Sequence, residues 1–160
     1  IVIAFLTMAP VIFDNKENIR ISYLGMENAW VMAPKPQLIR VFVNLITNAI
    51  QAVEIRQREL EAEGEEMIQG NVVIYLRNST KDGYYDVVVD DNGSGVKEEN
   101  ISRLFTPNFT TKSAGTGLGL AICRNIMEKC GGEISYKRSF ALGGASFTVT
   151  IPKKEDDEKC

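Results

Sequence analysis

Apolar residues change their spacing several times along the chain, and each change marks a predicted element. Residues 18–24 and 29–33 alternate between apolar and polar or small side chains, which predicts two short strands. Two prolines then end this alternation. From Gln37 to about Val53 the apolar residues follow helical spacing, which predicts a buried helix. The charged run at 54–70 is expected to leave the domain as a solvated helix and loop.

The second half of the chain predicts further strands and helices separated by short turns. The expected elements are strands at 71–77 and 84–91, a short helix at 97–105, a Thr-, Ser- and Gly-rich loop at 106–117, a helix at about 118–129, and strands at 133–137 and 145–151. The last residues have no apolar pattern and are expected to be disordered. A length of 160 residues fits a single domain with its own core.

The apolar start of the chain, residues 1–13, raises the question of a membrane span. A transmembrane helix needs about 20 apolar residues, so this segment is too short, and Pro10 interrupts it. It fits the end of a helix or an edge strand instead.

The composition removes several classes of function. Histidine is absent, and it is the commonest general base and metal ligand, so hydrolase and zinc-enzyme interpretations lose most of their support. The net charge of -3 and the lack of a basic stripe argue against nucleic acid as a partner. Cys123, Cys130 and Cys160 form an odd set without paired spacing, and nothing resembles a secretory signal, which favours a reducing compartment over an oxidising one.

The predicted helix at 37–53 carries a narrow strip of amides. On a helical wheel, Asn44, Asn48 and Gln51 fall within about 60° of one another. The adjoining face is apolar and is formed by Leu38, Val41, Phe42, Leu45, Ile46, Ala49 and Val53. Buried amides need hydrogen-bond partners, so either nearby backbone or a bound ligand must satisfy this strip.

A pair of carboxylates ends the predicted strand at 84–91. Side chains alternate between the two faces of a strand, so Asp91 follows the apolar valines inward, while Asp90 points with the polar set. Gly93 and Gly95 follow, and backbone without side chains allows a flat ligand to come close. A simple Asp-Asn-Gly turn is the alternative.

Three alternate glycines precede the predicted helix at 118–129. Gly115, Gly117 and Gly119 lead into its start, where free N–H groups and the positive end of the helix dipole favour phosphate. The spacing does not match the dinucleotide-binding GxGxxG pattern, because Leu120 stands at the third glycine position. A flexible loop is the alternative.

Together and in this order, four segments resemble a known set of motifs. The segments "NLITNAIQA", "DDNGSGV", "LFTPNFTTK" and "GTGLGLAI" resemble the N box, first glycine box, F box and second glycine box of sensor histidine kinase catalytic domains. These domains belong to the superfamily of gyrase, chaperone, histidine kinase and MutL ATPases. The resemblance covers residues 33–152 and implies a two-layer α/β sandwich of the Bergerat type. In such a fold a mixed sheet packs on helices, and ATP binds between the N box helix and a mobile lid, here residues 96–114.

The resemblance also implies the domain limits. Residues 1–32 would hold the end of a preceding linker and the first strands, residues 33–152 the ATP-binding core, and residues 153–160 a disordered tail.

The same resemblance assigns roles to individual residues. Asp91 would accept the adenine amino group, Asn48 would be the Mg²⁺ ligand, and Asn44 would support the metal and phosphates. Lys112 would meet phosphate, so the residues implied in catalysis are Asn44, Asn48 and Lys112. The implied ATP-binding set is Asn44, Asn48, Gln51, Asp91, Gly93, Gly95, Phe105, Phe109, Thr111, Lys112, Gly115, Thr116, Gly117, Leu118 and Gly119.

Three positions depart from the usual motifs. Gln51 stands where many members have a phosphate-contacting lysine, and Asn108 replaces the second aromatic residue of the F box. Cys130 stands where histidine is common, and small buried thiols are the expected state of Cys123 and Cys130.

Two function classes compete within the superfamily: a histidine kinase, and an ATPase switch or non-catalytic nucleotide-binding module. The hydrolytic branch has a glutamate at position 44 to activate water, whereas Asn44 cannot act as a general base, so a kinase is favoured. Because the chain has no histidine, the acceptor must lie on a dimerisation and phosphoacceptor domain outside it. A response regulator would act downstream. The domain itself would be cytoplasmic and touch no membrane, within a membrane-anchored parent.

Overall fold

The computed structural model describes residues 2–13, 18–109 and 119–154. Its elements are α1 (Val2–Ile12), β1 (Ile19–Gly25), α2 (Lys35–Ala62), β2 (Gly70–Asn78), β3 (Tyr84–Asp91), α3 (Glu98–Ile101), α4 (Gly119–Lys129), β4 (Glu133–Arg138) and β5 (Ala145–Pro152).

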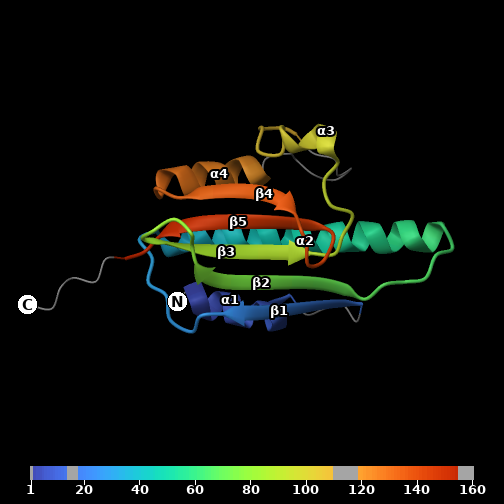
Figure 1. Ribbon diagram of the computed structural model, residues 1–160, viewed down its shortest axis with the longest axis horizontal. Coiled ribbons are helices and arrows are strands. Elements are labelled where there is room, and N and C mark those ends of the chain that lie inside the picture. The colour runs from blue at the N-terminus through green and yellow to red at the C-terminus, as the bar shows by residue number, and fades with distance from the viewer. Residues whose placement is uncertain (1, 14–17, 110–118, 155–160) are drawn as a thin grey trace, which may run out of the picture.

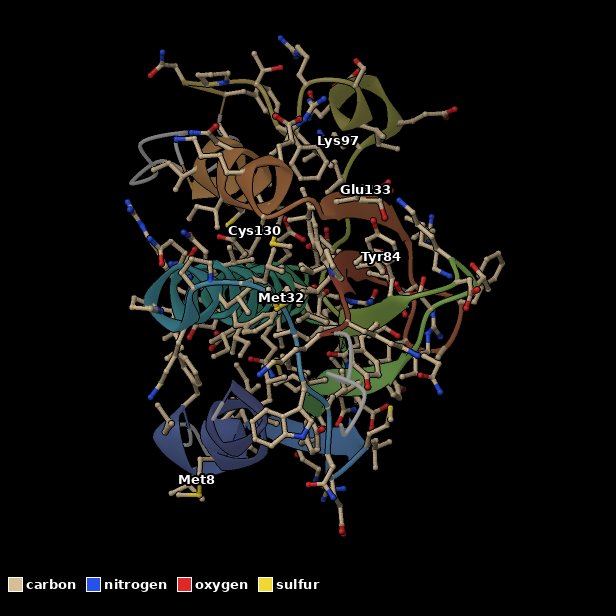
Figure 2. All side chains as sticks on the ribbon, turned by 90° about the vertical axis from the view of Figure 1, so that its left-hand side faces the viewer. Met8, Met32, Tyr84, Lys97, Cys130 and Glu133 are labelled. Atoms are coloured by element: carbon tan, nitrogen blue, oxygen red, sulfur yellow. The ribbon has the colours of Figure 1, made fainter. Side chains whose placement is uncertain are left out.

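The five strands form one mixed sheet in the order β1-β2-β3-β5-β4. β1 and β2 run parallel, while the β2/β3, β3/β5 and β4/β5 pairs are antiparallel. Helices α1, α2 and α4 all cover the same face of this sheet, and the view along the layers in Figure 2 leaves the opposite face without helices. The chain is therefore a two-layer α/β sandwich, which confirms the predicted fold class.

Burial of alternate strand residues against α2 forms the core. Val72 and Ile74 of β2 and Val89 of β3 are buried on the helix-covered face of the sheet. They meet the apolar stripe of α2, whose buried residues are Leu38, Val41, Phe42, Leu45, Ile46, Ala49, Val53 and Gln57. The hydrophobic effect holds the layers together here, and the apolar residues of this stripe are those that the helical wheel predicts.

Helix α2 begins where the two prolines stand. Pro34 is the N-cap residue and Pro36 lies in the first turn, where a missing backbone N–H costs nothing because that donor has no partner within the helix. Its length and composition alone would allow α2 to cross a membrane. Its apolar stripe packs on the sheet, however, so α2 serves as the core helix of the sandwich.

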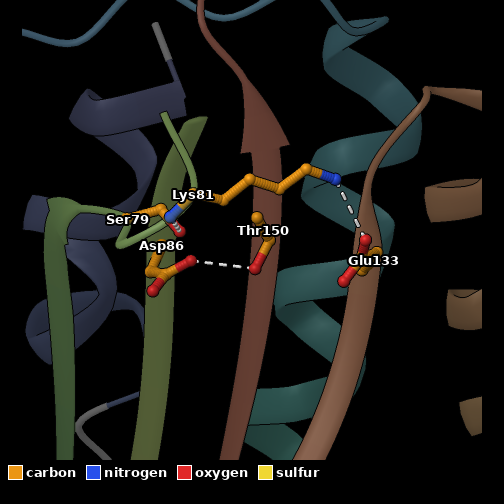
Figure 3. A network of polar contacts seen from close by, with 5 residues as sticks. All are labelled: Ser79, Lys81, Asp86, Glu133 and Thr150. Atoms are coloured by element: carbon orange, nitrogen blue, oxygen red, sulfur yellow. Dashed lines mark hydrogen bonds and ion pairs between the residues drawn. The ribbon is translucent and has the colours of Figure 1, made fainter. Parts of the chain in front are cut away.

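Polar contacts join neighbouring strands on the uncovered face of the sheet (Figure 3). The Thr150 hydroxyl on β5 donates to Asp86 Oδ1 on β3 over 2.8 Å, and Lys81 Nζ lies 3.1 Å from Glu133 Oε1 on β4. The turn that carries Lys81 is closed by a hydrogen bond from its backbone N–H to Ser79 Oγ. The contact of Lys81 with Glu133 connects the β2–β3 turn to the edge strand β4.

Several predicted elements differ from the structure near the ends of the chain. The strand predicted at 29–33 is wrong, because this segment makes a single antiparallel bridge between Val31 and Lys153. The N–H of Lys154 also donates to the Trp30 carbonyl over 2.7 Å, so the chain stays attached to the domain through residue 154. The apolar start is a helix, α1, with Pro10 inside its last turn.

The charged run after Val53 continues α2 as far as Ala62. The prediction of a fully solvated run is wrong for Gln57, which is buried. Its Nε2 donates to the carbonyls of Asn18 and Ile68, over 3.0 and 3.2 Å. This extension of α2 therefore packs on the domain.

Candidate functional site

The N box asparagines lie where α2 meets the start of α4. Asn44 and Asn48 are partly buried and stand one turn apart on α2. A Cβ added to Gly119, the first residue of α4, would lie 2.7 Å from Asn44 Oδ1. The second glycine box and the N box therefore touch directly, and only glycine fits at this contact without displacing the amide.

Asp91 ends β3 as a buried carboxylate on the face that α2 covers. Its Oδ1 accepts hydrogen bonds from the N–H of Gly93 over 2.8 Å and the N–H of Ala145 over 3.2 Å. The N–H of Gly144 donates to the Asp91 carbonyl over 3.1 Å. Backbone donors from two loops thus fix the orientation of this carboxylate, and hydrogen bonds to an ionised group are among the stronger ones.

The two glycines after Asp91 meet different structural demands. A Cβ on Gly93 would lie 2.6 Å from the carbonyl carbon of Ala52, because the loop packs against the backbone of α2. Gly95 has φ 73°, a conformation that side-chain-bearing residues rarely adopt. We call Asp91–Gly95 the glycine loop. The conformation of this loop therefore requires both glycines, whether or not a ligand is bound.

Asn92, between these residues, fixes the glycine loop to the sheet. Its Oδ1 accepts from the N–H of Asn71 over 2.8 Å, and its Nδ2 donates to the Gln69 carbonyl over 2.8 Å. No sequence motif assigned this role to Asn92. An asparagine next to a glycine favours turns and local side-chain bonds. The partners of Asn92 lie 21 and 23 residues away, so no local pattern signals these contacts.

Asp90 points to the opposite face of the sheet from Asp91, in accordance with strand alternation. Asp90 pairs with Val73 of β2 and Ser146 of β5. Although it belongs to the uncovered face, Asp90 is only 8% exposed, and its Oδ1 is buried without a hydrogen-bond partner among the described residues. Its surroundings are therefore unlike those of the hydrogen-bonded Asp91.

The F box residues connect the segment after α3 to the core. The Phe105 ring meets Phe147 of β5 edge to face, with centroids 6.4 Å apart. The Arg103 guanidinium lies 4.7 Å from the centroid of the Phe109 ring. Asn108 has φ 66°, which asparagine tolerates better than most residues. The backbone conformation thus accounts for an asparagine where the family pattern has an aromatic residue.

The remaining predicted site residues lie outside the residues that the structure describes. They are Thr111, Lys112, Gly115, Thr116, Gly117 and Leu118. Gln51 is an exposed residue of α2, one turn from Asn48. Within the described ranges, no three His, Cys, Asp or Glu side chains form a group that could hold a metal ion.

Cys123 is fully buried on α4, which confirms the expectation of a buried thiol. Its Sγ lies 3.9 Å from the Val41 carbonyl oxygen of α2. Burial raises the pKa of the Cys123 thiol to about 12, so the group is protonated at neutral pH. Cys130 is only partly buried, so the expectation is wrong for this residue, and both cysteines are free thiols.

A family model described as "Histidine kinase-, DNA gyrase B-, and HSP90-like ATPase" matches residues 34–155. The chain belongs to this family, as an ATP-binding domain homologous to the catalytic domains of sensor histidine kinases. The resemblance of the four motifs is thereby confirmed.

The relatives by sequence are sensor kinases from bacteria. Sensor histidine kinase ZraS of Salmonella typhimurium is 38% identical over 122 residues, which cover 76% of this chain and 23% of the relative. Sensor protein FixL of Bradyrhizobium diazoefficiens is 36% identical over 127 residues, which cover 79% of this chain and 23% of the relative. The chain therefore spans about a quarter of the length of these relatives.

Solved structures agree with the sandwich described above. The nucleotide-free catalytic domain of histidine kinase ThkA matches with a TM-score of 0.74 and 29% identity, over 96% of this chain and 92% of that one. The mycobacterial sensor histidine kinase MprB matches with a TM-score of 0.71 at 21% identity, which shows the shared fold alone.

Proposed function

We propose that this chain binds ATP with Mg²⁺ and delivers the γ-phosphoryl group to a histidine on a separate phosphoacceptor domain. The observation that carries the proposal is the buried Asp91. Two backbone N–H groups orient its carboxylate on the face of the sheet that also packs against the N box helix. A fixed buried carboxylate is suited to accept a hydrogen bond from the amino group of adenine.

The roles of the other residues follow from their chemistry. Asn48 would supply a side-chain oxygen to Mg²⁺, which prefers oxygen ligands and takes others from phosphates and water. Bound Mg²⁺ would neutralise charge on the phosphates. Asn44 of α2, which lies against the first residue of α4, would support that end of the site. The residues at 111–112 and 115–119 would contact the triphosphate, with Phe105 and Phe109 in the lid.

The chemistry required of the protein is mainly positioning. Phosphoryl transfer depends on orienting donor and acceptor and on stabilising charge, more than on covalent catalysis by side chains. Position 44 carries an amide that cannot take a proton from water, which favours transfer to an acceptor over hydrolysis. As histidine is absent from the chain, the acceptor belongs to another domain.

The relatives suggest the wider setting. They are named as sensor proteins, and this chain matches about a quarter of each. We therefore place the domain on the cytoplasmic side of a membrane-anchored sensor kinase, with a dimerisation domain as phosphoryl acceptor and a response regulator downstream.

Labelled ATP tests this function. The chain should bind MgATP in calorimetry and remain unlabelled after incubation with γ-labelled ATP. It should transfer acid-labile label to an added acceptor-helix domain that contains the phosphoacceptor histidine. Absence of nucleotide binding, or acid-labile label on this chain alone, would refute the proposal.

A further inference from the structure

We propose that Arg56 is a positioning residue that holds the glycine loop, Asp91–Gly95, in the conformation that binds the nucleotide base. This inference rests on the proposed function, because it concerns the same site. Arg56 lies in the charged extension of α2, outside all four motifs, and nothing in the sequence patterns singled it out.

Arg56 acts on the loop through two consecutive carbonyl groups. Its Nη1 donates to the carbonyl oxygens of Asn92 and Gly93, over 3.1 and 3.4 Å. The Asn92 carbonyl and the Gly93 N–H belong to one planar peptide group, so fixing the carbonyl also fixes the direction of the N–H. That same N–H donates to Asp91 Oδ1 over 2.8 Å. Arg56 thereby sets the orientation of the carboxylate proposed to bind adenine.

The helical turn that carries Arg56 is itself anchored. The next residue, Gln57, is buried and bonds to the carbonyls of Asn18 and Ile68. Glu59, most of a turn later, accepts a hydrogen bond from the Ser94 hydroxyl over 3.2 Å. The extension of α2 therefore contacts the glycine loop from a fixed position.

The loop is held from both layers of the sandwich. Asn92 fixes it to the start of β2, and Arg56 fixes it to α2. Without Arg56, the peptide between Asn92 and Gly93 would lose its side-chain partners on the helix side. We expect the loop to sample other orientations in that case, at a cost in affinity for the base.

Arg56 also lines an open hollow of about 320 Å³. Other residues around this hollow include Leu60, Ser94 and Arg138. A small guanidinium ion can enter such a space from solvent and take the place of a deleted arginine side chain. Rescue by an added guanidinium compound can therefore test whether the Arg56 side chain acts at this position.

The experiment compares three forms of the 160-residue chain: wild type, Arg56→Ala and the control Arg58→Ala. Arg58 lies on the same extension but is 72% exposed and pairs only loosely with Glu54, over 3.9 Å. Arg56→Ala should weaken MgATP binding in calorimetry by about three- to tenfold, since two hydrogen bonds are lost. Methylguanidinium should restore part of this affinity in Arg56→Ala and leave wild type unchanged. Arg58→Ala should bind as wild type does.

Hydrogen exchange of the Gly93 amide gives a readout that needs no nucleotide. It should be faster in Arg56→Ala than in wild type and in Arg58→Ala. Unchanged ATP affinity in Arg56→Ala, or weaker affinity with unchanged Gly93 exchange, would overturn the inference. Failure of wild type to bind ATP would instead refute the proposed function. If Arg56→Ala does not fold by circular dichroism, Arg56→Gln is measured in the same way, with the same two outcomes deciding.

Discussion

Asp90 and Asp91 are adjacent carboxylates on one strand with opposite environments. Asp91→Ala should lower ATP affinity by about 1.5 to 3 kcal/mol, roughly ten- to hundredfold, because a hydrogen bond to a charged acceptor is lost. Asp90→Ala should leave affinity unchanged, because Asp90 faces the other side of the sheet. Calorimetric titration of both variants, after circular dichroism confirms folding, measures the difference.

GTP provides a second check on the same carboxylate. Guanine has a carbonyl where adenine has an amino group, so Asp91 would face another acceptor and GTP should bind much more weakly than ATP. A larger loss from Asp90→Ala, or equal affinity for the two nucleotides, would contradict the assignment.

The two described cysteines should differ in reactivity. Burial raises the pKa of Cys123 from 9.0 to about 12, so at pH 8 its thiolate should be about one part in ten thousand. Cys130 is partly accessible. In a Cys160→Ser background, a thiol reagent should therefore modify one cysteine in the folded chain and the second only after unfolding. Mass spectrometry of the labelled peptides identifies which one reacts.

The pKa shift of Cys123 also affects stability at alkaline pH. Between about pH 9 and pH 12 the unfolded chain releases the thiol proton while the folded chain keeps it. The contribution of this group to stability is therefore complete below pH 9 and is lost as the pH rises through that window. Rapid labelling of Cys123 in the folded chain at pH 8 would contradict this assignment of a buried, protonated thiol.

The direction of a side chain was predictable where the repeat of a strand or a helix determines it. Strand alternation placed Asp91 inward, and the helical wheel identified the buried face of α2. The partners of Arg56 and Asn92 were not predictable, because they lie 36 and 21 residues away in the sequence. Such contacts depend on how the layers pack, which no local pattern specifies.

The extension of α2 should contribute to stability through Gln57. Gln57→Ala should lower the free energy of unfolding by about 1 to 3 kcal/mol, because two carbonyl groups lose a buried donor. Glu61→Ala, on the exposed side of the same extension, should change it by less than about 0.5 kcal/mol. Urea denaturation of both variants measures this, and equal effects would mean that the extension is solvated throughout.

Element types followed from apolar spacing more reliably than element ends. The strand at 84–91 matches β3 at both ends. The prediction ended the buried part of α2 near Val53 because the residues beyond it are mostly charged, yet the buried face continues at Gln57, one turn further on. Residues 29–33 alternate as a strand would, but in the described chain they make a single bridge, between Val31 and Lys153, and do not form a strand.

At the scale of the molecule, the segment after the glycine loop should respond to nucleotide. The contacts of residues 96–109 with the rest of the domain include the buried Leu104, the ring contact of Phe105 with Phe147, and a hydrogen bond from the Val96 N–H to the Tyr136 hydroxyl over 3.3 Å. These residues belong to the proposed lid, so their amide exchange should be fast in the free chain and slower when an ATP analogue binds and the lid closes. Hydrogen exchange with mass spectrometry, with and without the analogue, measures this. Equal protection in both states would indicate a rigid loop.

The sandwich and the order of its motifs were predictable because each motif carries several unusual residues at fixed spacing. The structure confirms a mixed sheet with helices on one face. It also supplies contacts between motifs that spacing could not give, such as the approach of Gly119 to Asn44. The motifs identify the segments that form the candidate site, whereas the contacts between these segments are known only from the folded structure.

The start of α1 and the end of β5 lie at one end of the sandwich, and β3 ends at the other, where the glycine loop follows it (Figure 1). A segment joined to either end would therefore attach to the domain far from the glycine loop, where the proposed base site lies. A small rotation about such an attachment would move the glycine loop farther than it moves the residues near the attachment.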